Sequence, residues 1–190
     1  MVNAPNSNGS ILVCVCGGIA AYKTCHVVSR LVQQNFSVHV AMTSAATHFV
    51  GPLTFETLSA HPVYLSLWQN PHPGQPPHIQ LAQESDLILV APATADMLAK
   101  MAHGLADDLV SSLLLAADPK KIIVAPAMNK MMWQNPATQR NCSLLDQAGI
   151  NAVGPDSGWQ ACRTIGGGRM SEPDEILTSI TQRLATRPAR

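Results

Sequence analysis

Short, mainly apolar runs, each closed by glycine, proline or hydroxyl residues, are the feature that most constrains the fold of this chain. Four such runs occupy residues 11–16, 37–42, 87–90 and 122–125, with shorter candidates at 63–67 and 151–153. Runs of this kind are typical of parallel strands buried on both faces. Helical periodicity fills residues 19–34, 52–59, 94–101, 108–117, 136–148 and 173–184. The alternation predicts an α/β fold, a three-layer, doubly wound parallel sheet of the Rossmann-like or flavodoxin-like kind.

Length and charge set the domain plan and exclude several partners. The 190 residues suit one domain over residues 11–185, after a flexible lead (1–10) and before a short tail (186–190). Lys plus Arg and Asp plus Glu number 12 each, so no global field attracts a nucleic acid or a membrane surface. Only 13% of the residues are charged, against roughly 25% in an average soluble chain, which favours extensive subunit interfaces.

Three further sequence features, membrane spans, signal peptides and cysteine motifs, bear on localisation, disulfide bonds and metal binding. No apolar run is long enough to span a bilayer, and residues 1–10 lack the charged and apolar regions of a signal peptide. We therefore expect a cytoplasmic protein. Five cysteines with no CxxC pair indicate neither a disulfide framework nor a metal site.

Small and hydroxyl residues follow four of the predicted strands. They are Gly17-Gly18, Thr43-Ser44, residues 92–96 and residues 126–129. Because the carboxyl ends of parallel strands meet at one edge of a sheet, we expect these segments to converge on one crevice. Gly17-Gly18 opens a helix and suits a phosphate, although a tight turn without a ligand fits the same residues.

Two polar side chains, Asn129 and His78, are candidate functional-site residues. Asn129 follows a strand and Pro126, and its neutral amide suits a carboxylate or a flavin edge. It equally suits a helix cap with the following Met/Trp cluster as core. His78 ends a proline-rich loop and should be partly exposed, although six other histidines compete for any role.

The glycine-rich segment 154–170 surrounds a single cysteine, Cys162. Five glycines in seventeen residues imply a mobile or tightly folded loop, the usual material of an active-site lid. Cys162 should be more accessible there than the cysteines on the strands, as a reactive thiol requires. The alternative is a surface loop with an incidental cysteine.

Taken in order, these motifs resemble the homo-oligomeric flavin-containing cysteine decarboxylases, over residues 11–184. The matching segments are residues 17–23 (GGIAAYK), 78–81 (HIQL), 91–96 (APATAD), 126–133 (PAMNKMMW), 161–162 (AC) and 166–170 (GGGRM). One departure stands in the predicted clamp loop, residues 154–170. The family usually has glycine where this chain has Arg163, and often an acidic residue where it has Thr164.

The resemblance implies a cofactor, FMN, and a set of site residues. The FMN-binding residues are Gly17, Gly18, Ile19, Thr43, Ser44, Thr94, Ala95, Asp96 and Ala127. The catalytic residues are His78, Asn129 and Cys162, and the substrate contacts are Asn129, Met132, Ala161 and Met170. Asn129 would hold the substrate carboxylate, His78 would transfer a proton, and Cys162 would donate one during the final reduction.

The implied activity is decarboxylation of 4'-phospho-N-pantothenoylcysteine to 4'-phosphopantetheine, through a thioaldehyde, in coenzyme A biosynthesis. The implied assembly is a homotrimer or a homododecamer, in which trimers are assembled further, with a separate phosphopantothenoylcysteine synthetase as a partner. Alternatives within the resemblance are a peptidyl-cysteine decarboxylase of the lantibiotic kind and a non-catalytic, FMN-binding phosphatase regulator. A flavin prenyltransferase and a flavodoxin-like electron carrier fit the same fold but not these motifs.

Overall fold

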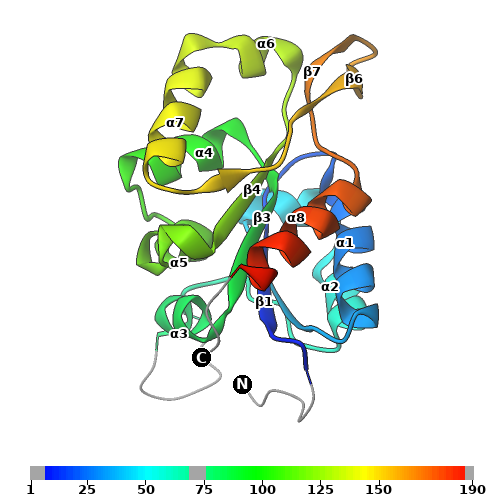
Figure 1. Ribbon diagram of the computed structural model, residues 1–190, viewed down its shortest axis with the longest axis vertical. Helices are drawn as coiled ribbons and strands as arrows, with labels where there is room; N and C mark the ends of the chain where they lie inside the picture. The colour runs from blue at the N-terminus through cyan, green and yellow to red at the C-terminus, as the bar shows by residue number, and fades with distance from the viewer. Residues whose placement is uncertain (1–6, 69–75, 187–190) are drawn as a thin grey trace.

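Five parallel strands form the centre of the protein (Figure 1). The computed structural model describes residues 7–68 and 76–186. The strands are β1 (Ser10–Val15), β2 (Ser37–Met42), β3 (Leu87–Ala93), β4 (Ile122–Pro126) and β5 (Asn151–Ala152). Their order is β2-β1-β3-β4-β5, and each neighbouring pair is parallel. This is the flavodoxin-like strand order, so the predicted doubly wound sheet is confirmed.

Helices cover both faces of this sheet. The α-helices are α1 (Ala21–Gln33), α2 (Pro52–Ser59), α3 (Pro77–Glu84), α4 (Ala95–His103), α5 (Leu109–Ala116), α6 (Lys130–Gln134), α7 (Pro136–Gln147) and α8 (Pro173–Ala185). Two short 3-10 helices are η1 (Ser44–His48) and η2 (Pro119–Lys121). Over the described part of the chain, none of the helices combines the length and apolarity needed to cross a membrane.

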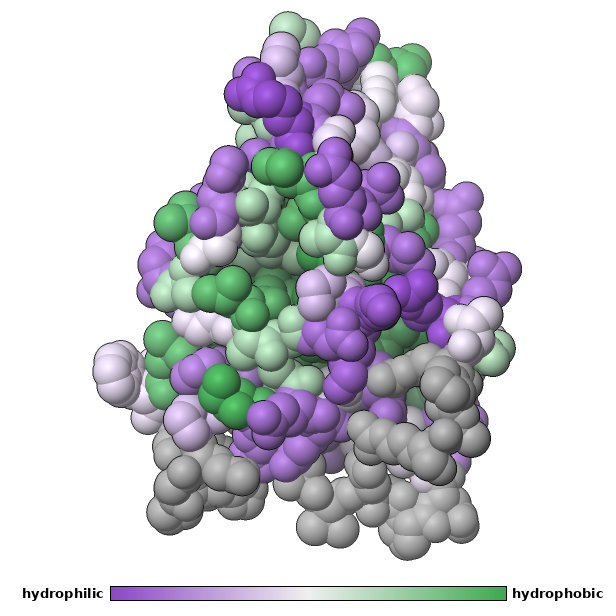
Figure 2. Space-filling view, turned by 60° about the vertical axis from the view of Figure 1, so that its left-hand side comes forward, coloured by the Kyte–Doolittle hydropathy of each residue, from purple (hydrophilic) through white to green (hydrophobic). Residues whose placement is uncertain are grey.

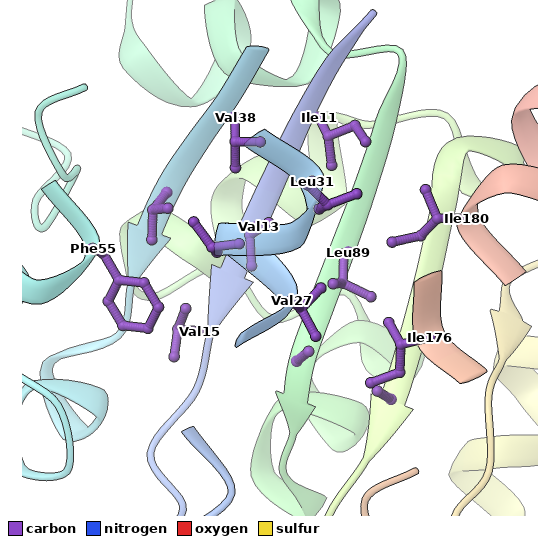
Figure 3. Close-up of a cluster of buried hydrophobic side chains, with 14 of the residues drawn as sticks. Ile11, Val13, Val15, Val27, Leu31, Val38, Phe55, Leu89, Ile176 and Ile180 are labelled. Atoms are coloured by element: carbon purple, nitrogen blue, oxygen red, sulfur yellow. The ribbon is translucent and has the colours of Figure 1, made fainter. Parts of the chain in front are cut away.

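Each face of the sheet buries its own hydrophobic core. Side chains alternate along β1, so Ile11 belongs to one core and Leu12 to the other. On the first face, α1, α2 and α8 contribute Val27, Phe55 and Ile176 (Figure 3). Helices α3, α4, α5 and α7 cover the second face. Because both faces are covered, the strands need no polar alternation, which is why they read as continuous apolar runs.

Some predicted boundaries differ from the structure. The predicted strand at residues 63–67 does not form, because only Tyr64 reaches the sheet, through a single parallel bridge to Ala41. Pro62 has no N–H to extend that pairing, and Leu65 turns outward. The first strand ends at Val15, one residue early, and α1 starts two residues late because a turn follows the strand. Residues 69–75 of the proline-rich loop lie outside the described residues.

The glycine-rich segment forms a separate hairpin of β6 (Asp156–Trp159) and β7 (Ile165–Arg169). Gly168 has a φ of +105°, and a Cβ there would lie 2.5 Å from the Met128 carbonyl oxygen. A Cβ on Gly166 would overlap the Lys130 side chain. The glycines therefore allow β7 to lie directly against the residues after β4, where the Met128 N–H donates to the Gly168 carbonyl at 2.8 Å. Of the two expectations for this segment, tight folding is the one observed.

Candidate active site

A pocket of about 980 Å³ lies between the carboxyl ends of the parallel strands and the β6–β7 hairpin. This is at the upper end of the range for small-molecule sites, roughly 300–1,000 Å³. All the predicted cofactor-binding and substrate-binding residues line it, as do Asn129 and Cys162. The predicted convergence of the strand ends on one crevice is thus confirmed.

One end of the pocket is built for an anion. Helix α1 begins there with Ala20 at its N-cap, and neither a side-chain cap nor an acidic residue occupies its first turn. The Ala21 and Lys23 N–H groups donate to the carbonyls of Gly18 and Ala20, but no side chain offsets the positive end of the helix dipole, which suits an anionic ligand. A Cβ on Gly17 would overlap Ala45, so only glycine lets the β1 turn approach the turn after β2. In that second turn, Thr43 caps η1 by accepting from the Ala46 N–H at 3.3 Å.

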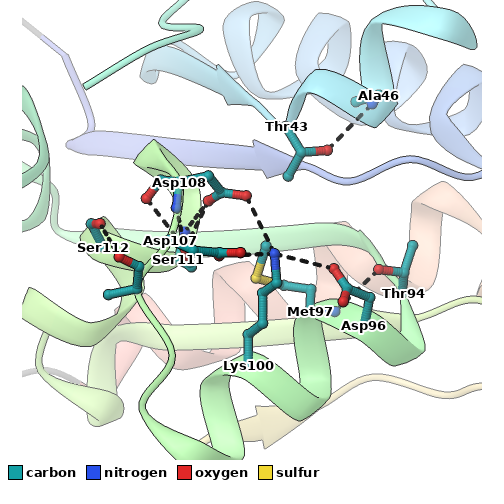
Figure 4. Close-up of polar contacts among 11 residues, drawn as sticks. Thr43, Ala46, Thr94, Asp96, Met97, Lys100, Asp107, Asp108, Ser111 and Ser112 are labelled. Carbon is teal, nitrogen blue, oxygen red and sulfur yellow. Dashed lines mark hydrogen bonds and ion pairs between the residues drawn. The ribbon is translucent and has the colours of Figure 1, made fainter. Parts of the chain in front are cut away.

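An ion-pair network stiffens the neighbouring wall (Figure 4). Lys100 on α4 reaches three carboxylates, at 2.9 Å to Asp107, 3.5 Å to Asp96 and 3.8 Å to Asp108. The hydrogen bond that Lys100 donates to the Asp107 carboxylate is the main reason that the pKa of Lys100 is raised. Sequence reasoning missed Lys100, although its i,i+4 spacing from Asp96 on a predicted helix was an available signal. Thr94 caps the same helix.

Asn129 serves as a helix cap and as a site residue at the same time. Its Oδ1 accepts from the Met131 N–H at 2.8 Å, which caps α6. Its Nδ2 donates to the Cys162 Sγ at 3.2 Å. Capping therefore fixes the orientation of the amide and aims the NH2 group at the thiol and the pocket. The helix cap that the sequence offered is therefore observed, but the Met/Trp cluster after it is not core, since Met131 and Met132 are 72% and 49% exposed. The interpretation of the amide as a ligand contact stays a prediction.

Cys162 is the exposed thiol that the sequence predicts. It stands at the hairpin tip with the Thr164 Oγ1 at 3.0 Å. The hydroxyl of Thr164, and then the amide of Asn129, lower the pKa of Cys162 by stabilising its thiolate. Arg163 beside it has a φ of +63°, the left-handed conformation that glycine adopts freely. The glycine usual at this position in the resembling family fits that backbone without strain.

A buried cation ties α1 to the base of the hairpin. Lys23 donates to the Met170 carbonyl at 3.3 Å and to the Glu172 carboxylate at 2.9 Å. Arg169 pairs with the same carboxylate. Lys23, primarily, lowers the pKa of Glu172. Lys23 and Arg169 both line the pocket, and neither was singled out from the sequence.

His78 is the one predicted site residue that the structure does not bring to this pocket. It lies in the first turn of α3, on a helix at the opposite end of the molecule from the hairpin (Figure 1). It is half-buried, and its Nδ1 is buried with no hydrogen-bond partner among the described residues. The predicted exposure was about right, but a single chain does not place this imidazole beside Asn129 and Cys162.

Comparison with known proteins agrees with this geometry. The model of the family described as Flavoprotein matches residues 2–185. The coenzyme A biosynthesis bifunctional protein CoaBC of Bacillus subtilis is 46% identical over 171 residues, which cover 90% of this chain and 42% of that protein. CoaBC of Escherichia coli K12 is 47% identical over 167 residues, which cover 88% and 41%. The chain thus spans less than half the length of these relatives.

Solved structures share the fold along almost the whole chain. A cysteine-to-serine mutant of PPC decarboxylase complexed with pantothenoylaminoethenethiol superposes with a TM-score of 0.83 at 30% identity, covering 94% of this chain and 99% of that one. The FMN binding protein AtHal3 gives a TM-score of 0.82 at 30% identity, covering 95% and 99%. The resemblance drawn from the motifs is therefore confirmed, and the chain belongs to the Flavoprotein family.

Proposed function

We propose that this protein is an FMN-dependent decarboxylase that converts 4'-phospho-N-pantothenoylcysteine to 4'-phosphopantetheine. The observation that carries the proposal is the pairing of a capped, fixed amide with an exposed thiol, Asn129 Nδ2 to Cys162 Sγ at 3.2 Å, on the wall of a cofactor-sized pocket. The names of the relatives support it, since they are coenzyme A biosynthesis proteins and a PPC decarboxylase.

The pocket residues fit FMN. The uncapped N-terminus of α1 beside Gly17 and Gly18 suits its phosphate, and the hydroxyls of Thr43 and Ser44 can add hydrogen bonds. Thr94, Ala95, Asp96 and Ala127 lie on the adjoining wall, where small side chains allow a flat ring to approach the backbone. Bound FMN would supply the two-electron oxidation of the substrate thiol to a thioaldehyde and, after CO2 leaves, the return of those electrons.

The residues of this chain would orient the substrate and deliver a proton. The Asn129 NH2 group would hold the cysteinyl carboxylate. A neutral amide orients this group without stabilising its negative charge as strongly as lysine would, so loss of CO2 is opposed less. Cys162 would then give its proton to the enethiol carbon. Its lowered pKa favours this step, because Thr164 and Asn129 stabilise the thiolate left behind.

His78 would act at the pocket of a neighbouring copy. The low charge fraction of 13% supports assembly into trimers or dodecamers. Exposed apolar residues lie at the pocket rim, such as Ile19 and Tyr22, each more than half exposed. Apolar side chains also gather around a recess in the face shown in Figure 2. A separate synthetase as partner and a cytoplasmic location complete the proposal.

Inter-subunit complementation tests the placement of His78. His78→Asn and Asn129→Asp should each abolish turnover alone, and a co-expressed mixture should recover part of it, because some sites then receive both native residues. Full activity of His78→Asn would contradict a proton-transfer role. An inactive mixture of two inactive variants would contradict a shared site.

The direct test is turnover by the purified protein. We expect a yellow protein that releases FMN on denaturation and forms CO2 from 4'-phosphopantothenoylcysteine, with little from a peptide that ends in cysteine. The Asn129→Asp variant keeps the α6 cap and loses the NH2 donors, so FMN should stay bound while turnover falls by at least ~100-fold. Asn135→Asp is the matched control. Asn135 caps α7 in the same way, at 2.9 Å to the Ala137 N–H, outside the pocket. An FMN-loaded protein that forms no CO2 would refute the proposed reaction.

A further inference from the structure

Gln160 connects the hairpin to the segment that carries Asn129. Its side chain is buried, with only 7% of the residue exposed. The Nε2 donates to the carbonyl oxygens of Met128 at 3.2 Å and Gly167 at 2.9 Å. The Oε1 accepts from the Lys130 N–H at 3.1 Å and faces the Cys162 thiol at 3.6 Å. Both donors and both lone pairs of this amide therefore have partners.

The partners of Gln160 bracket the two reacting side chains. Met128 and Lys130 stand on either side of Asn129, so one amide holds the backbone both before and after it. The backbone of Gln160 also closes the hairpin tip, since the Arg163 N–H donates to its carbonyl and its own N–H donates to the Thr164 carbonyl, both at 2.9 Å. Cys162 lies inside that closed turn.

Besides Gln160, the hairpin is bonded to the residues after β4 by the Met128 N–H to the Gly168 carbonyl and by the Asn129 amide to the Cys162 thiol. A two-stranded hairpin is marginally stable in water by itself. Its last cross-strand pair, Trp159 and Ile165, is 63% and 70% exposed and so contributes little burial. The glycines of β7 allow close approach but have no side chains to hold it. A buried, fully bonded amide is the contact with the strongest distance requirement at this junction.

We propose that Gln160 is the positioning residue of this site, setting the separation and orientation of the Asn129 amide and the Cys162 thiol. The inference rests on the proposed function in that these two groups are the ones that orient the substrate and deliver the proton. Gln160 makes no hydrogen bond with the Asn129 side chain, and its one contact with the Cys162 thiol is the long one at 3.6 Å. It acts through the register between the hairpin tip and the residues after β4.

The Gln160→Leu variant tests the proposal in the full-length, FMN-loaded protein. It keeps a similar volume and removes all four polar contacts of the side chain. We expect FMN content to be unchanged and kcat to fall by roughly 10- to 100-fold, since small misplacements of reacting groups have effects of that size. The pH midpoint for alkylation of Cys162 by iodoacetamide should rise, because the thiolate loses its contact with Asn129. Gln160→Asn, which keeps the amide one methylene short, should behave like Gln160→Leu and serves if that variant does not fold.

A double-mutant cycle separates positioning from general support. Asn129→Ser keeps a capping oxygen and removes the NH2 group, so it should raise the alkylation midpoint by itself. Adding Gln160→Leu to it should change the midpoint little further, because the contact being positioned is already gone. Gln139→Leu is the control. The Gln139 Nε2 also donates a hydrogen bond to a residue of α6, the Trp133 carbonyl at 2.6 Å, but this bond is exposed to solvent. Its loss should leave the alkylation midpoint of Cys162 unchanged.

Two results would overturn the proposal: an unchanged Cys162 midpoint in Gln160→Leu, or effects of Gln160→Leu and Asn129→Ser that simply add. The alkylation measurement uses no substrate. A wild-type protein that failed to decarboxylate phosphopantothenoylcysteine would therefore refute the proposed function, while the cycle would still report whether Gln160 sets this contact.

Discussion

The pocket has two walls that are held in place by different forces. The sheet wall consists of the strand ends and turns at residues 16–23, 43–45, 94–100 and 127, and the hairpin wall of residues 159–162 and 168–170. Each wall carries a cysteine. Cys16 directly follows β1 and is only 1% exposed, and burial raises its pKa to about 12. Cys162 is exposed, and hydrogen bonds lower its pKa. Under the proposed function, the sheet wall would hold the cofactor and the hairpin wall would present the reacting thiol.

The largest expected difference between the two walls is in the rate at which their cysteines, Cys16 and Cys162, are alkylated. At pH 7.5 Cys162 should be alkylated much faster than Cys16, because its pKa is lowered while that of Cys16 is raised to about 12, and burial also shields Cys16 from the reagent. Peptide mapping after a timed reaction of the native protein with iodoacetamide measures both sites together. Comparable labelling of the two cysteines would show that the sheet wall opens as readily as the hairpin wall.

Replacing each of the two cysteines by serine should show which thiol the reaction needs. Cys162→Ser should lower overall turnover by at least ~100-fold, the usual range for a lost general acid. It should still release CO2 in a single turnover, leaving the enethiol product and reduced flavin. Cys16→Ser should bind FMN and turn over within a few-fold of wild type, because its thiol stays protonated at neutral pH. Wild-type steady-state turnover by Cys162→Ser would remove the thiol from the mechanism.

A pair of glycine variants tests how tightly the hairpin wall is docked. Gly168 and Gly149 both have positive φ, at +105° and +84°, so alanine is strained at either, by about 1–2 kcal/mol. Only Gly168 also faces a carbonyl oxygen, at 2.5 Å, whereas nothing lies within 4 Å at Gly149. Gly168→Ala should therefore lower kcat far more than Gly149→Ala, and it should also lose more stability in urea unfolding, because the overlap with the Met128 carbonyl adds to the backbone strain. Equal kcat values would mean that the docking of β7 does not matter for the reaction.

The sequence predicted the sheet wall better than the hairpin wall. Apolar runs that stop at Gly17, Thr43 and Thr94 are local signals, and parallel strands bring such stops together wherever the sheet is formed. The contacts of Gln160 with Met128 and Lys130 join residues about thirty positions apart, and no local pattern marks them. Cys162 was found because glycines surround it.

The proton-transfer role of His78 came from resemblance alone. Under the proposed function, His78 would act in the pocket of another copy of the chain, and a single sequence does not place that copy. The strand predicted at 63–67 failed for a related reason, since its apolar pattern says nothing about whether the sheet edge extends that far.

The contact between the two walls at Lys23 and Glu172 should have the smallest effect, and it depends on pH. Lys23 lowers the pKa of Glu172 below its ordinary 4.5, so the folded state binds this proton less readily than the unfolded state does. The stabilisation is present above the unfolded pKa and is lost as pH falls through the folded pKa. Because the carboxylate side chain is 48% exposed, the contribution should not exceed about 1 kcal/mol.

Glu172→Gln should therefore lower the urea midpoint slightly at pH 7, and the difference from wild type should shrink as the pH falls through the lowered folded pKa of Glu172. Asp174→Asn is the control. The Asp174 carboxylate is 84% exposed and lies 3.8 Å from Arg30, so its removal should leave the urea midpoint unchanged at neutral and at low pH. A Glu172→Gln effect that persisted at low pH would show that the side chain acts through packing or capping of α8. The charge would then not be what joins α1 to the hairpin, and the two walls would depend on Gln160 and the β7 glycines for their alignment.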